Sequence, residues 1–372
     1  MKKTTLLTCA ITLFTGLNSF TPSSWAADQI IRPYQSVRNA GMGGVRITTG
    51  FYDENFFGNP ARVTANPTWR VGLPDPLIEF GAGTFDTFGD LTEGDDTLSQ
   101  VGNTAGNNNH GRIQMTFPSF YIPKGEGRWA FAFSIITSLQ FDMNLHRNFQ
   151  LDPQAIIDVG PAFTVGRTFL EDQKLSVGVT PHVTYRLASE ANYGLDDLIR
   201  GASLSPLGSG GDGAHVDFDI GATYDLPWHY KEFDFTTGAS INNMLGGKYK
   251  NIPVSLADLG TAPPEQPRAL NVGVSAKRKS WGKLDDVVFA LDVSDIGNNT
   301  DGSIFRLLHM GSEVRWRRLQ ARLGFNQGYW TAGFGADLKI LQIDLATYGE
   351  EMSLNTGGAE DRRYALRLGF QI

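Results

Sequence analysis

Cysteine is almost missing from this sequence: its 372 residues contain one, Cys9. That cysteine lies in a short apolar run, residues 6–17, which follows Lys2 and Lys3 and precedes the triplet Ser24-Trp25-Ala26. A basic start, a short apolar run and a small-x-small triplet are typical of a secretory signal peptide. We therefore expect residues 1–26 to be a signal peptide cleaved near Ala26, and the exported chain to contain no disulfide.

Long hydrophobic runs are missing as well. Beyond residue 26, no apolar stretch approaches the roughly 18 residues of a transmembrane helix. The cluster Gly41-Met42-Gly43-Gly44 lacks the Lys-Ser or Lys-Thr of a phosphate-binding loop, and no strand is expected before it. A formal net charge of −7 disfavours nucleic acid as a partner.

Histidine is scarce, and its pattern predicts no metal site. The six histidines are scattered and show no metal-ligand spacing. Loop 83–111 is acidic; solvated acidic loops are common, and whether this one binds Ca²⁺ or Mg²⁺ stays open. Pairs such as His309 with Glu313 arise by chance on strands of period two. We therefore predict no catalytic residues, no enzyme activity and no cofactor.

Alternating hydrophobicity, in contrast, is abundant. In residues 129–145, WAFAFSIITSLQFDMNL, eight of the nine odd positions are apolar, whereas the even positions are small and then polar. A period of two indicates a β-strand, because a helix would mix the two faces. This strand is longer than the roughly 9–11 residues that a tilted strand needs to cross a bilayer. The same alternation recurs at 175–187, 216–226 and 364–372.

Counting such segments predicts an all-β fold, a 14-stranded antiparallel transmembrane β-barrel of the outer-membrane kind. An even strand number is expected of bacterial barrels, and closure leaves no unpaired edge in lipid. The predicted strands are 68–82, 112–122, 127–148, 155–170, 173–189, 214–227, 233–246, 267–280, 284–295, 303–317, 318–327, 329–339, 340–350 and 360–372.

Connection lengths predict how the barrel is oriented. The connections at one end are tight, as at 123–126, whereas those at the other end include the long loops 83–111, 190–213 and 247–266. Short periplasmic turns and long external loops are typical of the outer membrane of Gram-negative bacteria. We therefore expect outer-membrane lipid, lipopolysaccharide and the barrel-assembly machinery as partners.

A resemblance explains the glycine cluster. The stretch SVRNAGMGGVRI…NPARV resembles the N-terminal signature of the FadL/TodX family and its PorV-like and TraF-like relatives, and residues 323–351 resemble the last strands of that PorV/TraF branch. The resemblance implies that residues 27–66 form a hatch inside the lumen and residues 67–372 the barrel. The residues that match the hatch motif or shape it are Gly41, Gly43, Gly44, Asn59, Pro60 and Ala61.

Two functions stay open at this point. The FadL resemblance implies uptake or binding of small hydrophobic, fatty-acid-like molecules through a hatch-gated lumen. The alternative is a non-transporting outer-membrane scaffold of a secretion or conjugation system, as in PorV-like or TraF-like proteins. An apolar path through the lumen would favour transport. The candidate ligand-binding residues, which lie in the long loops, are Leu195, Leu198, Ile199, Leu204, Leu207, Leu256 and Leu259.

Overall fold

The structure is a computed structural model that describes residues 31–84, 108–145, 150–194, 196, 209–250, 262–298, 303–352 and 356–372. The predicted signal peptide lies outside the described residues, so residues 1–26 and their cleavage site stay a prediction.

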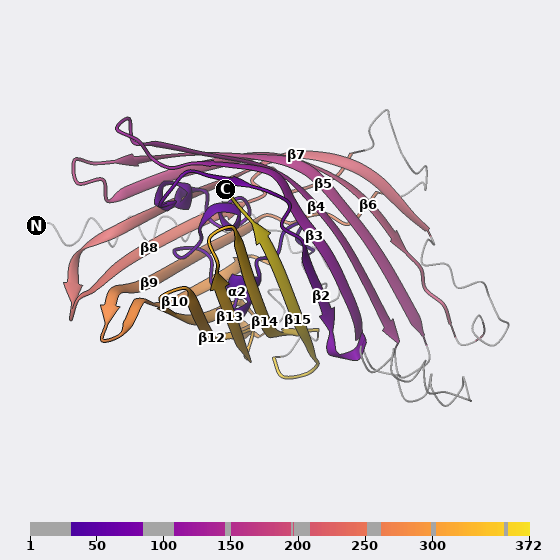
Figure 1. Ribbon diagram of the computed structural model, residues 1–372. Helices are drawn as coiled ribbons and strands as arrows, with labels where there is room; N and C mark the ends of the chain where they lie inside the picture. Colours follow the sequence, from indigo (N-terminus) through magenta and orange to yellow (C-terminus); the bar gives the residue numbers. More distant parts are fainter. Residues whose placement is uncertain are drawn as a thin grey trace, which may run out of the picture.

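The strands close into one antiparallel ring (Figure 1). Each strand from β2 to β15 pairs with its neighbours in sequence, and β15 returns to pair with β2. The predicted 14-stranded barrel is therefore confirmed, with β1 as one extra short strand. The strands are β1 (Arg70–Gly72), β2 (Leu77–Gly81), β3 (Asn108–Ile122), β4 (Trp129–Leu145), β5 (Leu151–Phe169), β6 (Leu175–Glu190), β7 (Ser209–Tyr230), β8 (Phe233–Asn242), β9 (Ala269–Trp281), β10 (Leu284–Ile296), β11 (Leu308–Trp316), β12 (Leu319–Asn326), β13 (Tyr329–Asp337), β14 (Leu341–Glu351) and β15 (Glu360–Phe370).

The first predicted strand, 68–82, is broken in two. Its parts, β1 and β2, both pair with β3. Between them lie Pro74 and Pro76, which have no N–H to donate to a strand ladder. On the facing strand the pairing of β3 with β4 shifts register between Thr116 and Ser119. The wall is thus irregular on two adjacent strands.

Other predicted boundaries need correction. Residues 304–307, predicted as strand, form the 3-10 helix η3 (Ile304–Leu307), because the Ser303 side chain accepts a hydrogen bond from the Phe305 N–H. Loop 190–213 is shorter than predicted, since β7 already starts at Ser209 and pairs with the end of β6. Loop 83–111 ends earlier too, where β3 begins. The remaining strands differ from prediction only at their ends.

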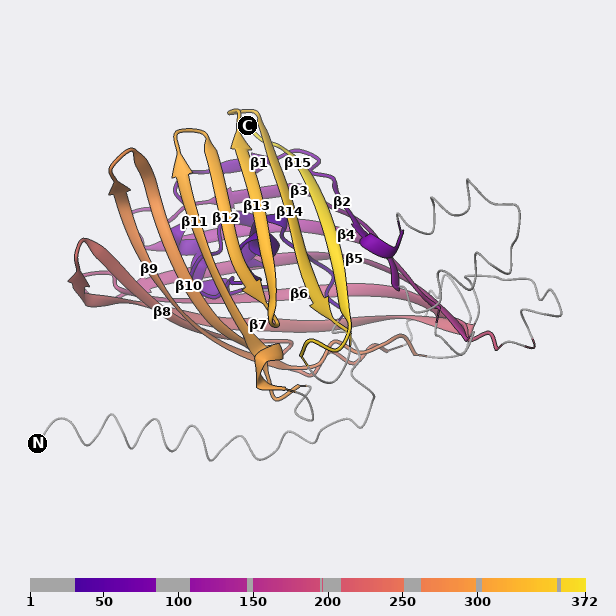
Figure 2. The same cartoon turned by 90° about the horizontal axis from the view of Figure 1, so that it is seen from below.

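The tight hairpins gather at one end of the strands (Figure 2). They join β3 to β4, β5 to β6, β7 to β8, β9 to β10, β11 to β12 and β13 to β14. At the opposite end, Gln327 and Gly328 form one further tight connection, between β12 and β13. The short-turn pattern predicted from the sequence is therefore present.

The outer surface of the ring is apolar. Large side chains such as Ile113, Phe163, Phe289 and Leu323 are 42–64% exposed on different strands. A water-soluble protein rarely exposes apolar surface all round. A closed barrel that does so is an outer-membrane barrel, with lipid outside. Among the described residues, no helix is long and apolar enough to cross a membrane.

The polypeptide before β1 lies inside the ring. We call residues 31–66 the lumen segment. It contains the helix α2 (Val37–Gly41) and the 3-10 helices η1 (Tyr52–Asn55) and η2 (Pro60–Ala65), drawn in indigo in Figure 1. Most of its residues are buried, and its helices contact β3–β7 and β12–β15.

Candidate functional site

The glycine cluster of the lumen segment lies backbone-to-backbone against the wall. Gly43 and Gly44 have φ of +71° and +84°, a conformation that favours glycine. A Cβ added to Gly43 would lie 2.1 Å from the Met310 carbonyl oxygen, and one added to Gly41 would lie 2.9 Å from the Gly333 Cα. Both positions therefore require glycine on steric grounds.

The Asn59-Pro60-Ala61 motif starts η2 and docks that helix on the wall. The Asn59 Oδ1 accepts a hydrogen bond from the Ala61 N–H at 3.1 Å, which caps the helix. The Asn59 Nδ2 donates to the carbonyl oxygens of Ile47 (2.9 Å) and Ala222 (3.2 Å). Pro60 occupies the first turn, where its missing N–H has no cost. One fully buried asparagine thus joins helix, segment and wall.

Glycines of the barrel wall lie opposite these two motifs. Gly311 and Gly324 lie under Met42 and Gly43, whereas Gly178 and Gly221 lie under Pro60 and Asn59: an added Cβ would lie 1.9–2.6 Å from these partners. Neighbouring glycines pair across the strands, as Gly178 does with Gly221 and Gly311 with Gly324. We call this set the glycine seat; its members are Gly166, Gly178, Gly221, Gly238, Gly273, Gly311, Gly324 and Gly333.

The glycine seat has a signal in the sequence that is separate from the motifs of the lumen segment. Glycine inside a strand weakens it, and often marks a close approach of another backbone. Each seat glycine lies in the interior of a predicted strand, at positions that face the lumen. Reading them together would have placed the lumen segment against β5–β9 and β11–β13.

Buried ion pairs hold the side of the lumen segment that faces β11–β14. Arg38 of α2 donates to Glu54 Oε2 at 3.0 Å and to Glu313 of β11 at 2.8 and 2.9 Å. Glu313 also accepts from Arg322 at 2.7 Å, and Arg322 from β12 reaches Asp344 of β14 at 2.7 Å. Each charge is paired, as burial requires.

Two further contacts tie the segment to other parts of the wall. Asp292 of β10 accepts hydrogen bonds from the backbone N–H groups of Arg46 (2.6 Å) and Ile47 (2.9 Å). Arg367 of β15 lies 3.2 Å from Asp53 and 2.9 Å from Asp75, which sits in the break between β1 and β2. The segment is therefore held by charge on strands β10 to β15.

Burial shifts the pKa values of the ionisable groups of the segment. It lowers the pKa of Arg46 to about 10, with the nearby Arg32 adding to the effect, and it lowers the pKa of Arg62 to about 10. Burial raises the pKa of Glu54, although its ion pair with Arg38 opposes this rise. Arg38 thus keeps the pKa of Glu54 below the value that burial would otherwise give it.

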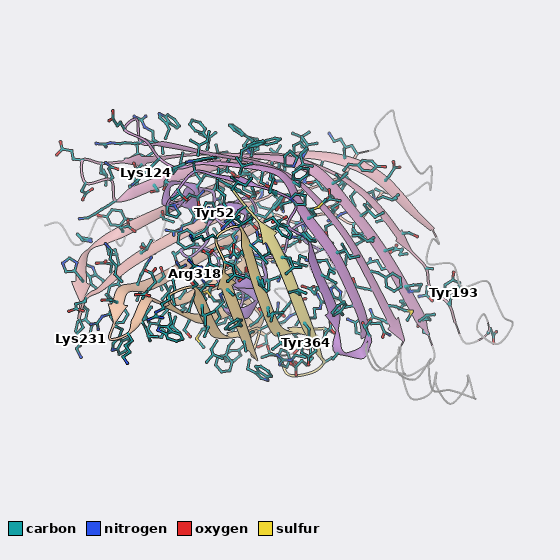
Figure 3. The ribbon with its side chains drawn as sticks, viewed as in Figure 1. Tyr52, Lys124, Tyr193, Lys231, Arg318 and Tyr364 are labelled. Atoms are coloured by element: carbon teal, nitrogen blue, oxygen red, sulfur yellow. The ribbon has the colours of Figure 1, made fainter. Side chains whose placement is uncertain are left out.

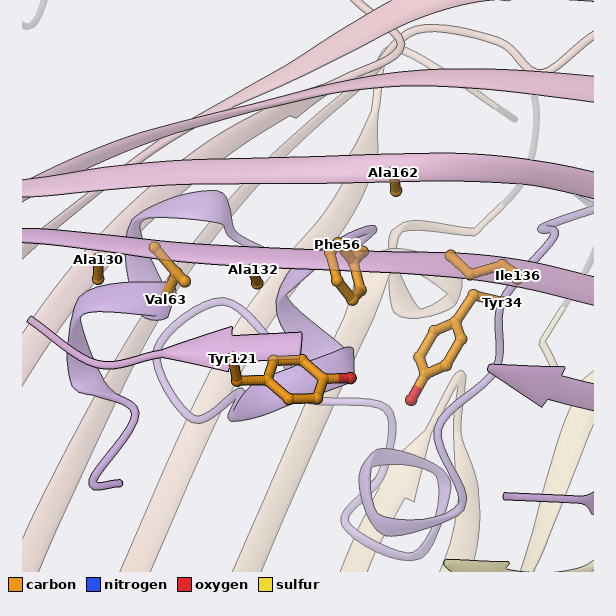
Figure 4. Packing of buried hydrophobic residues seen from close by; sticks show 8 residues of the cluster. All are labelled: Tyr34, Phe56, Val63, Tyr121, Ala130, Ala132, Ile136 and Ala162. Atoms are coloured by element: carbon orange, nitrogen blue, oxygen red, sulfur yellow. The ribbon is translucent and has the colours of Figure 1, made fainter. Parts of the chain in front are cut away.

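The opposite side of the segment is apolar. Tyr34, Phe56 and Val63 pack on the wall formed by β3–β5, where small residues face them (Figure 4). The wall residues of this apolar cluster are Tyr121, Ala130, Ala132, Ile136 and Ala162. Tyr52 and Phe57 add partly buried rings. The side toward β3–β5 is therefore held mainly by apolar packing, whereas the side toward β10–β15 combines ion pairs with two smaller apolar clusters built on Val37 and Met42.

A small polar cavity lies beside α2, toward the long-loop end. It has a volume of about 60 Å³ and is lined by residues that include Arg32, Asn39, Arg46 and His309. A second cavity, of about 30 Å³, adjoins it next to Phe57. Both have room only for a few water molecules.

The remaining predictions from the sequence concern the long loops, the histidines and metal binding. The loop residues Leu195, Leu198, Ile199, Leu204, Leu207, Leu256 and Leu259 lie outside the described residues, so their role stays a prediction. His309 donates to the Gly43 carbonyl oxygen at 3.0 Å, so it supports the segment. In the described part of the chain, no group of three or more His, Cys, Asp or Glu residues could hold a metal ion.

No protein-family model and no curated protein matches the chain. Among solved structures, it resembles a deletion mutant of the TodX monoaromatic hydrocarbon channel, with 12% identity, 91% of this chain and 97% of that chain covered, and a TM-score of 0.49. The Ralstonia pickettii toluene transporter TbuX follows with 12% identity, coverage of 90% and 96%, and a TM-score of 0.48. The transport unit of the Escherichia coli autotransporter AIDA-I has 11% identity, coverage of 82% and 89%, and a TM-score of 0.40.

TodX gives its name to the family that the sequence resembles. These scores are too low for the likeness to add anything on function. The PorV/TraF branch stays a prediction. So do the hatch role of the segment and its domain boundary at residue 66.

Proposed function

We propose that this outer-membrane barrel takes up small hydrophobic molecules through a lumen that the lumen segment gates. The observation that carries the proposal is the uneven distribution of charge around the segment: its ion pairs with the wall lie on β10–β15, whereas toward β3–β5 it is held by apolar packing and by two hydrogen bonds to Gln114 of β3. The apolar side is the one that a hydrophobic molecule can enter, because it replaces one apolar contact by another.

The wall on that side is suited to a bound apolar molecule. Ala130, Ala132 and Ala162 are small, so that the space in front of them is filled by rings of the segment, including Tyr34 and Phe56. A modest movement of these rings would open an apolar surface on β4 and β5. The ion pairs on the far side would keep the segment attached while this happens.

The break between β1 and β2 adjoins this surface. Tyr121, which lies on β3 beyond the register shift, belongs to the apolar cluster and packs edge-on against Tyr52 at 5.3 Å between ring centroids. The strand ladder is interrupted there, so fewer backbone hydrogen bonds oppose a local opening. A hydrophobic molecule could therefore leave the lumen near this break.

A second candidate function is a non-transporting scaffold of PorV-like or TraF-like type. The observation in its favour is the set of buried ion pairs on the β10–β15 side of the lumen, where the two cavities found among the described residues have room only for a few water molecules. Under this reading, the segment is a permanent filling of the barrel.

Uptake by intact cells separates the two functions. N-phenylnaphthylamine becomes fluorescent when it passes the outer membrane, and cells with the barrel should take it up faster than cells without it. Ala132→Trp would block the apolar cluster and slow uptake. Ala276→Trp, on the lipid-facing side of β9, is the matched control and should leave uptake unchanged. Equal uptake with and without the barrel would contradict transport and leave the scaffold as the proposed function.

A further inference from the structure

The end of the barrel that carries the tight hairpins is rich in cationic side chains. We call it the short-turn rim. Of the nine lysines that follow Ala26 in the sequence, seven lie at or beside these hairpins, although the chain as a whole carries a net charge of −7. Figure 3 marks Lys124 and Lys231 at this end, and Tyr193 at the other. The seven are Lys124, Lys174, Lys231, Lys277, Lys279, Lys283 and Lys339.

Arg167 forms the first aromatic site of the rim. Its guanidinium carbon lies 5.0 Å from the ring centroid of Trp129 on β4, and 5.4 Å from that of Phe169 on β5. The two rings are 44% and 39% exposed on the lipid-facing surface. The Arg167 Nε has no hydrogen-bond partner in the described part of the chain. This Nε is buried, and no carboxylate in the described part of the chain pairs with Arg167, so its charge is not balanced by a described side chain.

Arg278 on β9 forms a second site of the same kind, four strands further round the ring from Arg167 on β5. Its guanidinium carbon lies 5.9 Å from the Phe233 ring and 5.4 Å from the Trp281 ring. It also pairs with Glu232, whose side chain is 74% exposed. Below Phe233, Phe289 continues the apolar wall at 6.1 Å between ring centroids. The two arginine sites thus share one plan: a cation between two lipid-facing rings, above an apolar surface.

Two smaller pairs extend the pattern around the rim. The Lys231 ammonium lies 5.3 Å from the Tyr230 ring, and the Arg317 guanidinium lies 5.6 Å from the Trp316 ring. Aromatic rings of this kind lie at headgroup depth in membrane proteins, and a cation beside them meets lipid phosphates.

We propose that the short-turn rim binds the headgroup phosphates of anionic glycerophospholipids, with Arg167 and Arg278 as its two anchors. The lipid chains would lie on the apolar wall next to Phe163 and Phe289, where an acidic protein would have no reason to bind. The proposal stands apart from the proposed function, since neither anchor contacts the lumen segment.

Quenching by brominated lipids tests the proposal, because Trp129 and Trp281 lie at the two sites. The barrel is reconstituted in phosphatidylcholine with increasing brominated phosphatidylglycerol, or with brominated phosphatidylcholine as the neutral probe. In the wild type we expect phosphatidylglycerol to associate more strongly, on the order of fivefold at low ionic strength. The preference should decrease as salt screens the charges.

Variants test which arginines cause the preference for phosphatidylglycerol. Arg167→Gln combined with Arg278→Gln should reduce the ratio of the two association constants to about one. Arg62→Gln is the matched control, since Arg62 lies 5.4 Å from the Phe51 ring but inside the lumen, out of contact with lipid, and it should keep the wild-type ratio. Equal quenching by the two lipids in the wild type would overturn the proposal and leave an acidic protein as the partner. An unchanged ratio in the double variant would overturn the assignment of the anchors.

Discussion

Single residues decide how the lumen segment sits, because two backbones meet without side chains between them. Gly43 combines a positive φ with a neighbour that leaves no room for a Cβ. Gly282, in the β9–β10 turn, has a similar φ of +65°, but nothing lies within 4 Å of the place where its Cβ would be. Substitutions at Gly43 and Gly282 can therefore be compared to separate the free-energy cost of a positive φ from that of the steric overlap.

We expect Gly43→Val to unseat the lumen segment while leaving the barrel folded. The conformation alone costs about 1–2 kcal/mol, and the clash with the Met310 carbonyl adds a similar amount. Ion conductance in planar bilayers should rise, whereas the heat-modifiable gel mobility of the barrel should stay the same. Gly282→Val carries only the conformational cost and should not change conductance; equal effects of both would contradict a role for the contact.

Asn59 offers a test of which of its hydrogen bonds matters. Asn59→Asp keeps the oxygen that caps η2 through the Ala61 N–H, but places a negative charge in front of the Ile47 and Ala222 carbonyl oxygens. Asn59→Ala loses the cap as well, at about 1 kcal/mol. We expect Asp to loosen the segment more than Ala, as measured by protease cleavage within residues 31–66. The reverse order would show that the cap dominates.

Some features of the lumen segment can be predicted from the sequence, and others cannot. The Gly41–Gly44 cluster and Asn59 were recognised by their motif, because both motifs are local in sequence. Arg38 was missed, since its partner Glu313 lies 275 residues away and only the closed ring brings the two together. The broken first strand was missed for a related reason: Pro74 and Pro76 signalled it, but the alternation around them continued.

At the scale of elements, α2 is the part of the segment that depends most on charge. Arg38 and Arg62 lie equally close to the Phe51 ring, each at 5.4 Å. They differ in their polar partners, since Arg38 joins two carboxylates whereas the Arg62 Nε donates to the Gly50 carbonyl oxygen. This makes Arg62 a natural control for Arg38.

We expect Arg38→Met to loosen the segment at neutral pH and acidification to restore it. Without Arg38, burial and the nearby Asp53 raise the pKa of Glu54 in the seated state above the value of about 4.3 that it has in water, although the hydrogen bonds from Phe51 and Ser36 oppose this rise. The seated state then binds the proton more tightly, so its stability is present at low pH and is lost as pH rises. The loss at neutral pH should approach about 3–5 kcal/mol. Conductance should fall between neutral pH and about pH 5; Arg62→Met should show no such recovery.

At the scale of the whole molecule, the direction of the barrel in the membrane is a prediction that labelling can test. No cysteine follows Cys9, so an introduced thiol has no background. On intact cells, a membrane-impermeant maleimide should label Gly358→Cys, in the β14–β15 connection, but not Lys124→Cys, in the β3–β4 turn. The opposite pattern would reverse the topology, and recovery of the protein in the soluble periplasmic fraction would contradict the membrane barrel. Lipopolysaccharide and the assembly machinery stay predictions as partners.

The glycine seat also bears on how the barrel is built. The lumen segment precedes every strand in the chain, yet three of its eight seat glycines lie on β11–β13, and the ring is closed by the pairing of β15 with β2. The residues that the finished ring encloses are therefore synthesised before the strands that enclose them. We therefore expect the barrel to assemble around the lumen segment, with the later strands added after the segment is already present. In this order, the seat glycines on β11–β13 can contact the backbone of the lumen segment as their strands are added.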